Sequence, residues 1–257
     1  MDQKIGLTLS GGGARGIAHI GVLQALESAG IFPDVISGCS AGAMVGALYA
    51  EGFSPRKIYS LIENKSIYSI IKMGLPNKGM MELGYFRKIL TENIPHDSFE
   101  QLKKPFYVSV TNLNTGKFEI IGSGKLTDFV IASQSIPLVF KPQKIGEHFY
   151  VDGGVLNNLP VEPIRDQCDI LIGVNVTPIN NTEKLTGMRD VGFRILNLSL
   201  MTNMESRMEK CDFLIEPETA DYTIFDVNKS KIIYDAGYEA ALPVAEKIIQ
   251  FIKTENR

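Results

Sequence analysis

Short apolar runs alternate with helix-like segments along the first fifty residues. Residues 5–9 and 35–37 form the apolar runs and predict buried strands. The apolar positions of residues 17–29 cover much of a helical circumference, and Gly30 is well placed to end that helix. A small-residue helix is expected over residues 43–50. Strand, helix, strand and helix at this spacing predict parallel strands that are joined by right-handed crossovers.

The rest of the chain continues the mixture of strands and helices. Ser54 and Pro55 have the form of an N-cap and a first helical residue, and predict a helix to about residue 64. Further helices are expected over 85–91, 126–135, 191–208 and 232–253, and strands over 105–110, 117–121, 148–151, 169–176 and 213–215. Because no repeat or linker divides the sequence, we expect a single domain over residues 1–257.

Two segments have no clear period. Residues 65–84 interleave methionine and isoleucine with glycine, which is typical of a packed connection between helices. An adaptable surface for apolar ligands is the alternative, because methionine side chains are flexible. Residues 180–187 are polar and predict a loop.

Composition excludes several classes of protein. The chain has 257 residues, of which 44% are hydrophobic and 21% charged, as in ordinary globular proteins. A net charge of −3 without a basic run argues against nucleic acid as a partner. The three cysteines form neither a disulfide framework nor a zinc motif, so no metal is expected. Without a signal peptide or a spanning apolar stretch, the expected location is the cytoplasm.

The segment that carries the clearest chemistry is residues 38–42, Gly-Cys-Ser-Ala-Gly, which we name the serine turn. It follows an apolar run and precedes a helical stretch, the context in which this motif presents a nucleophile. Gly38 and Gly42 allow the strand and the helix to approach closely. Ser40 would then stand at a helix N-terminus, which stabilises negative charge. A glycine-rich turn with an ordinary serine is the simpler alternative.

A second motif, residues 10–16, is named the glycine loop. It matches the G-x-G-x-x-G dinucleotide fingerprint at positions 11, 13 and 16, after a strand and before a helix. The ribose-binding acid could be Asp34, but Asp34 precedes the second strand, whereas that acid should follow it. Both loops lie at the same edge of adjacent parallel strands. We therefore expect the amides of Gly12, Gly13 and Ala41 to form an oxyanion hole for Ser40.

A serine nucleophile needs a base, and histidine does not fit that role in this chain. No histidine follows Asp152, so the usual order of serine, acid and histidine is excluded for that acid. His19 lies among buried positions and is expected to be structural, and His96 is expected in a solvated loop. His148 shares a strand face with Tyr150 and Asp152, but about 13 Å of extended strand separates it from Asp152.

The remaining candidate is the carboxylate of Asp152, which ends a strand before Gly153 and Gly154. The two glycines allow other backbone to approach closely, although an Asp-Gly pair also forms simple turns. An aspartate with an ordinary pKa near 3.9 is a weak base at neutral pH. We expect burial to raise the pKa of Asp152 and a short hydrogen bond to align it with Ser40. Cys39 is interpreted as a packing residue.

Four segments resemble, in the same order, the sequence blocks of the patatin-like phospholipase family, including its bacterial single-domain members: residues 11–16, 38–42, 132–137 and 152–154. The resemblance implies a Ser–Asp dyad without histidine, carried here by Ser40 and Asp152. It also implies a three-layer α/β/α fold with a mixed, mostly parallel sheet. The reaction would be hydrolysis of acyl esters without calcium or another cofactor.

The resemblance extends to the residues around the dyad. It implies that the glycine loop supplies the oxyanion hole, with Gly11 beside Gly12 and Gly13. Arg15 matches an arginine that accompanies this loop in related sequences. It could steady the loop, meet a phosphate group, or simply be a solvent-facing helix residue. Gly38, Gly42, Gly153 and Gly154 are expected to support the site.

The sequence therefore predicts a serine acyl hydrolase in which Ser40 attacks an ester and Asp152 transfers the proton. Phospholipids or lysophospholipids are the expected substrates, with residues 65–84 and 138–140 as candidate acyl-chain contacts. Membrane contact would be peripheral, and the oligomeric state is left open. One alternative is a dinucleotide-binding oxidoreductase that uses the glycine loop. The other is a non-catalytic adaptor on the same fold.

Overall fold

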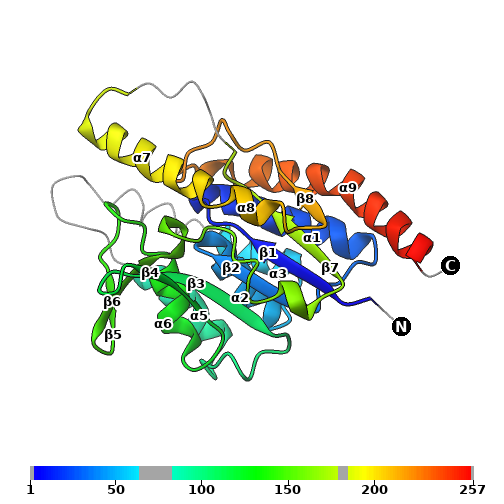
Figure 1. Cartoon of the computed structure of the whole chain (residues 1–257), viewed down its shortest axis with the longest axis horizontal. Coiled ribbons are helices and arrows are strands. Elements are labelled where there is room, and N and C mark those ends of the chain that lie inside the picture. Colours follow the sequence, from blue (N-terminus) through cyan, green and yellow to red (C-terminus); the bar gives the residue numbers. More distant parts are fainter. Residues whose placement is uncertain (1–2, 64–82, 179–184, 256–257) are drawn as a thin grey trace.

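The computed structural model describes residues 3–63, 83–178 and 185–255, which contain a mixed sheet of eight strands (Figure 1). Its strands are β1 (Ile5–Leu9), β2 (Val35–Cys39), β3 (Phe106–Asn112), β4 (Lys117–Ile121), β5 (Gln143–Ile145), β6 (His148–Asp152), β7 (Ile170–Val174) and β8 (Phe213–Ile215). The order β3-β2-β1-β7-β8 is parallel throughout, whereas β4, β5 and β6 are antiparallel to their partners. The expected mixed, mostly parallel sheet is confirmed.

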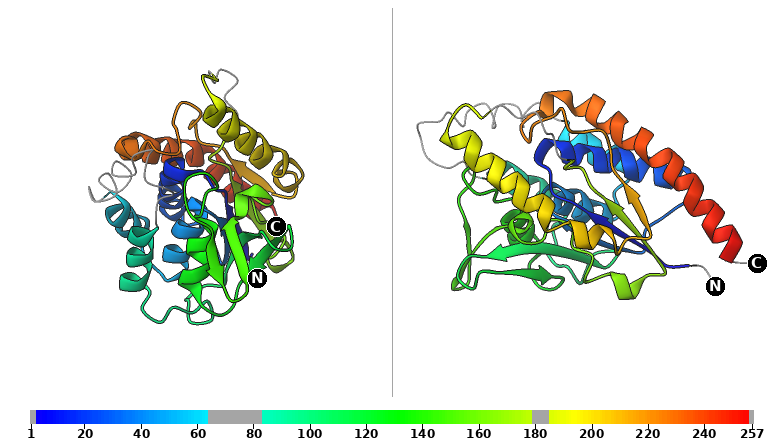
Figure 2. Two further views of the ribbon diagram at one scale, coloured as in Figure 1. Left: turned by 90° about the vertical axis from the view of Figure 1, so that its left-hand side faces the viewer. Right: turned by 45° about the horizontal axis from the view of Figure 1, so that its top comes forward.

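Helices cover both faces of the sheet. They are α1 (Ala18–Ser28), α2 (Ala41–Ala50), α3 (Pro55–Ile62), α5 (Gly84–Asn93), α6 (Leu126–Ser133), α7 (Met188–Thr202), α8 (Glu205–Met208) and α9 (Ser230–Glu255). Helix α1 connects β1 to β2, and α2 lies in the connection from β2 to β3, so both connections run toward the β3 side of the sheet. Helices α7 and α8 lie in the connection from β7 to β8, which runs toward the opposite side of the sheet. Right-handed crossovers therefore place these two sets on opposite faces. Helix α9 lies along α1 (Figure 2).

Coverage on both faces explains why the central strands are apolar without alternation. Every residue of β1, β2 and β7 is buried, as in parallel sheets that lie between helices. Ser54 caps α3 by accepting a hydrogen bond from the Lys57 amide, and Gly30 ends α1 with a positive φ of 76°, as expected. No helix among the described residues combines the length and the apolar composition needed to cross a membrane.

Several predicted boundaries need correction. The helix expected over 191–208 is two helices, because the chain breaks at Asn203 and buries Met204 completely. The strand β5 was not predicted, since three half-exposed residues give no usable alternation. The helix expected from residue 17 is preceded by a 3-10 turn, Gly13–Ile17. Most of the 65–84 segment and of the 180–187 loop lies outside the described residues.

The strand β3 positions the site, because three strands pair with its two edges. Val108 and Ser109 pair with both β2 and β4, and the next three residues of β3 pair with both β4 and β6. Because β4 occupies one edge along this whole stretch, β2 and β6 must share the other edge. Cys39 at the end of β2 pairs with Ser109, and Asp152 at the end of β6 pairs with Val110. The carboxyl ends of β2 and β6 therefore meet head to head.

The residue after Asp152 must turn away from β3 at this meeting point. A Cβ atom on Gly153 would lie 2.2 Å from the backbone oxygen of Ser109. No Cβ atom tolerates such a distance to a backbone atom, so glycine at position 153 is a steric requirement of the junction.

We predict that Gly153→Ala lowers the free energy of unfolding by about 3 kcal/mol or prevents folding, because the added methyl group overlaps backbone. Gly84→Ala is the matched control, because a Cβ atom there has nothing within 4 Å and position 84 is helical. This control should be neutral or stabilising, by up to about 1 kcal/mol. Urea unfolding of both variants measures the difference, and equal stabilities would contradict the steric account.

Candidate active site

Ser40 lies at the turn between β2 and α2, with a strained backbone. Its φ of 52° and ψ of −122° are rarely adopted by non-glycine residues, and such strain costs about 1–3 kcal/mol. Its amide donates to Ser133 Oγ at 2.8 Å, and that hydroxyl donates to the Ser109 backbone oxygen at 2.7 Å. A Cβ atom on Gly42 would lie 2.4 Å from the Leu9 backbone oxygen, so the serine turn packs directly on β1. The surrounding structure thus holds Ser40 in its strained conformation.

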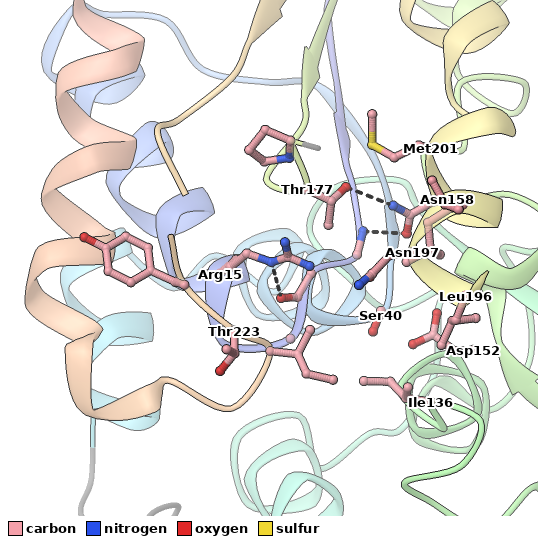
Figure 3. A pocket seen from close by; sticks show the side chains of 18 of the residues that line it. Arg15, Ser40, Ile136, Asp152, Asn158, Thr177, Leu196, Asn197, Met201 and Thr223 are labelled. Carbon is pink, nitrogen blue, oxygen red and sulfur yellow. Dashed lines mark hydrogen bonds between the residues drawn. The ribbon is translucent and has the colours of Figure 1, made fainter. Parts of the chain in front are cut away.

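Asp152 is 6% exposed and its carboxylate points toward the Ser40 hydroxyl (Figure 3). The Asp152 amide donates to the Ser135 backbone oxygen at 3.1 Å. Its Oδ1 accepts from the Gly154 amide at 2.8 Å and from the Cys39 thiol at 3.5 Å. Two donors on one carboxylate oxygen fix the orientation of the group beside Ser40.

The environment of Asp152 changes its acidity in the direction expected from the sequence. Burial raises the pKa of Asp152 from 3.8 to about 6, while hydrogen bonds from Ser40, Gly154 and Cys39 act in the opposite sense. Burial and the neighbouring carboxylate raise the pKa of the Cys39 thiol well above its ordinary value. Cys39 therefore remains a protonated donor to Asp152. Its interpretation as a packing residue missed this contact.

The glycine loop lies beside Ser40, and its three consecutive glycines line the same pocket as Ser40 and Asp152. The Gly11 amide donates to Asn158 Oδ1 at 3.1 Å, so it is not available to an oxyanion, and the expectation for Gly11 needs correction. Among the described residues, no acceptor takes the amide of Gly12 or Gly13. Ala41 opens α2, where the first amides have no partner within the helix.

Asn158 is a site residue that the sequence did not indicate. It is 1% exposed and donates through Nδ2 to Thr177 Oγ1 at 3.5 Å and to Met204 Sδ at 3.1 Å. Its own amide donates to Asn203 Oδ1 at 2.9 Å. Together with its bond to Gly11, Asn158 joins the glycine loop, the segment after Asp152 and the break between α7 and α8. A single asparagine in a loop has no periodicity that could have revealed this role.

Arg15 is buried, with 8% of its surface exposed, so the solvent-facing alternative is wrong. Its Nε donates to the Gly12 backbone oxygen at 3.4 Å, drawn as a dashed line in Figure 3. The next anchor of the loop is the Ala14 amide, which donates to the Ile224 backbone oxygen at 2.9 Å. The bond from Arg15 steadies the glycine loop from within, and the bond from Ala14 anchors it to the segment before α9.

The three histidines have partners other than Ser40 and Asp152. Burial lowers the pKa of His19 to about 4, and its Nε2 lies 2.8 Å from the Ser10 backbone oxygen, which fits the structural role expected for it. His96 is half-buried and lies 2.9 Å from Glu51 Oε2, so the expectation of a solvated residue needs correction. His148 is exposed and contacts the ring of Tyr150.

Asp34, the acid that a dinucleotide site would use, is not at the site. It precedes β2 and accepts a hydrogen bond from the Ile5 amide at the start of β1. Asp34 therefore lies at the end of these strands that is opposite to the serine turn.

Ser40 borders two pockets. The charged pocket has a volume of about 340 Å³, and its polar lining includes Arg15, Asp152, Asn158, Thr177, Arg194 and Asp221. The apolar pocket has a volume of about 100 Å³, and its lining includes Met44, Val45, Leu83, Phe86, Phe140 and Val227. The charged pocket also has an apolar wall from α7, which includes Leu196 (Figure 3).

Comparisons with known proteins identify the family and the fold. A sequence model of the family described as patatin-like phospholipase matches residues 7–165, which include both Ser40 and Asp152. The chain is 28% identical over 274 residues to mouse patatin-like phospholipase domain-containing protein 6. It is 33% identical over 188 residues to the lysophospholipase NTE1 of Cryptococcus neoformans.

These relatives are much longer proteins. The matched regions cover 92% and 70% of this chain, but only 20% of the mouse protein and 12% of the fungal one. Among solved structures, VipD from Legionella pneumophila is similar with a TM-score of 0.57 at 16% identity. That alignment covers 96% of this chain and 67% of VipD, and it supports the fold alone.

We predict that Asp152→Asn stabilises the protein at neutral pH. Because the folded-state pKa is raised, the unfolded carboxyl loses its proton first, and stability falls as pH rises from about 3.8 to about 6. Above that window the buried charge costs about 3 kcal/mol, which the amide avoids. Thermal unfolding of both proteins at pH 7.5 and pH 4 measures this effect. The gain should be present at pH 7.5 and small at pH 4, and an equal difference at both values would contradict the buried-charge account.

Proposed function

Because this chain belongs to the patatin-like phospholipase family, we propose that it is a serine acyl hydrolase that cleaves carboxylic esters of lipids. The observation that carries this proposal is the meeting of Ser40 and Asp152 at one pocket, with the glycine loop beside them. The names of the relatives, phospholipase and lysophospholipase, favour phospholipids or lysophospholipids as substrates.

In the proposed reaction Ser40 Oγ attacks the ester carbonyl while Asp152 accepts the hydroxyl proton. The oxyanion that forms accepts hydrogen bonds from the amides of Gly12, Gly13 and Ala41. Each such donor typically contributes about 3 kcal/mol to transition-state stability. Asp152 then gives its proton to the leaving alcohol, and an acyl-enzyme remains on Ser40. Water activated by Asp152 cleaves this intermediate and releases the fatty acid.

The acidity of Asp152 suits both halves of this cycle. With a pKa of about 6, the carboxylate is ionised in about nine-tenths of the molecules at pH 7, yet it binds a proton far more readily than an ordinary aspartate. General acid–base catalysis is most effective when the pKa of the catalytic group lies near the working pH. A buried carboxylate can therefore take the place that histidine has in other serine hydrolases.

The two alternatives have less support. A dinucleotide site would need an acid beside the glycine loop, but Asp34 lies at the other end of the strands. A non-catalytic adaptor would have no reason to maintain the strain at Ser40 or the buried charge at Asp152. The single domain, the cytoplasmic location and the peripheral membrane contact expected from the sequence remain predictions.

We predict that a fluorophosphonate probe labels Ser40, because attack on phosphorus mimics attack on an ester. Ser40→Ala should abolish labelling and lower kcat/KM for p-nitrophenyl esters by at least about 10⁴-fold. Mass spectrometry of the labelled peptide identifies the site. Ser199→Ala is the control, since Ser199 is exposed on α7 and its hydroxyl donates, among the described residues, only to the Val155 backbone oxygen. Full turnover by Ser40→Ala would reject the proposed function.

We predict that kcat/KM falls below pH 6 with the slope of one ionisation, because protonated Asp152 cannot accept the Ser40 proton. Cys39→Ala removes a hydrogen bond that favours the ionised carboxylate, so the midpoint of this acid limb should move to higher pH. Cys39→Ser keeps a hydrogen-bond donor at this position and should shift the midpoint of the acid limb less than Cys39→Ala does. A rate that is independent of pH between about 4.5 and 8 would contradict Asp152 as the base.

A further inference from the structure

Ser40 stands between the charged pocket and the apolar pocket and lines both of them. An ester that reacts with Ser40 has two parts to place, the acyl chain and the alcohol. The two pockets differ in which other reacting groups they contain, and this difference decides which part lies where.

Asp152 lines the charged pocket and is not among the described residues that line the apolar pocket. As the general acid, Asp152 must lie within hydrogen-bond reach of the alcohol oxygen that leaves. The leaving alcohol therefore belongs in the charged pocket. At the tetrahedral carbon, one oxygen faces the glycine loop, a second faces Asp152 and the third is Ser40 Oγ. The remaining substituent of that carbon, the acyl chain, is therefore directed into the apolar pocket.

Both pockets have apolar walls, so the property that distinguishes their linings is charge. Among the described residues of the apolar pocket none is charged, and its one amide side chain, Gln134, already donates to the Val130 backbone oxygen. Such a lining binds hydrocarbon, at about fourfold in binding constant for each buried methylene group. The charged pocket offers Arg15, Arg194 and Asp221. Charges of both signs fit an alcohol that carries a phosphate and an ammonium group.

We propose that the acyl chain of the substrate binds in the apolar pocket and that the alcohol, with a phosphate-bearing headgroup, binds in the charged pocket, where Arg194 contacts the phosphate. This assignment rests on the proposed function. The C–O bond to the alcohol breaks as the bond from Ser40 Oγ to the acyl carbon forms. The Ser40 proton passes through Asp152 to the alcohol oxygen, and the alcohol departs from the charged pocket. Water then enters the vacated space beside Asp152.

The position of the acyl chain is tested with p-nitrophenyl esters from acetate to dodecanoate, which share one leaving group. Val227→Trp fills the small apolar pocket, and the ratio of kcat/KM for butyrate over acetate should fall by about tenfold relative to wild type. Leu196→Trp, the matched change in the charged pocket, should leave this ratio within about twofold. Phe86→Ala enlarges the apolar pocket and should raise the ratio of octanoate over butyrate.

The opposite pattern overturns the assignment. If Leu196→Trp shortens the preferred chain and neither Val227→Trp nor Phe86→Ala changes it, the acyl chain lies in the charged pocket. Failure of the proposed function is a separate result, because the wild-type protein would then hydrolyse no ester and take up no fluorophosphonate.

The headgroup is tested with two lipids that share one acyl chain, lysophosphatidylcholine and monoacylglycerol. Arg194→Gln should lower the ratio of kcat/KM for the first over the second by about tenfold, because one charge-assisted hydrogen bond to phosphate is lost. Lys253→Gln removes a positive charge from α9, outside both pocket linings, and should leave the ratio unchanged. An unchanged ratio in Arg194→Gln overturns the assignment of the phosphate to the charged pocket.

Discussion

The structure of the site depends on one edge of β3, which β2 and β6 must share. Since β4 holds the other edge, the two strands meet end to end, and Cys39 and Asp152 pair with consecutive residues of β3. The distance along the strand between those partners is about 3.3 Å. Backbone pairing therefore brings a serine and an aspartate together although 112 positions separate them in the chain, from 40 to 152. The side chains of Ser40 and Asp152 can therefore interact although both are short.

The junction of β2 and β6 determines the chemical environment of Asp152 as well as the position of that residue. A strand end that is closed by another strand excludes water, and burial raises the pKa of the carboxyl group. The same closeness supplies the Cys39 thiol and the Gly154 amide, which keep the raised pKa within a useful range. The strained turn at Ser40 and the buried charge at Asp152 both oppose stability. The parallel sheet, buried between its helices, offsets them.

Much of this arrangement could be predicted from the sequence, because its signals are local. The apolar runs located β1, β2 and β7, and the serine turn and the glycine loop located Ser40 and the segment beside it. The lack of a suitable histidine and the family resemblance indicated Asp152. The contacts that complete the site could not be predicted in this way. The shared edge of β3, the bond from Gly11 to Asn158 and the burial of Arg15 all depend on residues distant in the chain. No period or motif encodes such pairings.

The central claim is that the Ser40 hydroxyl and a buried Asp152 carboxylate interact directly. Titration of the ¹³C-labelled carboxyl group of Asp152 by NMR, assigned with Asp152→Asn, tests this claim in the wild-type protein and in Ser40→Ala. We expect a pKa of about 6 in the wild type and a higher value in Ser40→Ala, because the hydroxyl stabilises the ionised form. A wild-type pKa near 4 that does not change when the hydroxyl is removed would contradict the account.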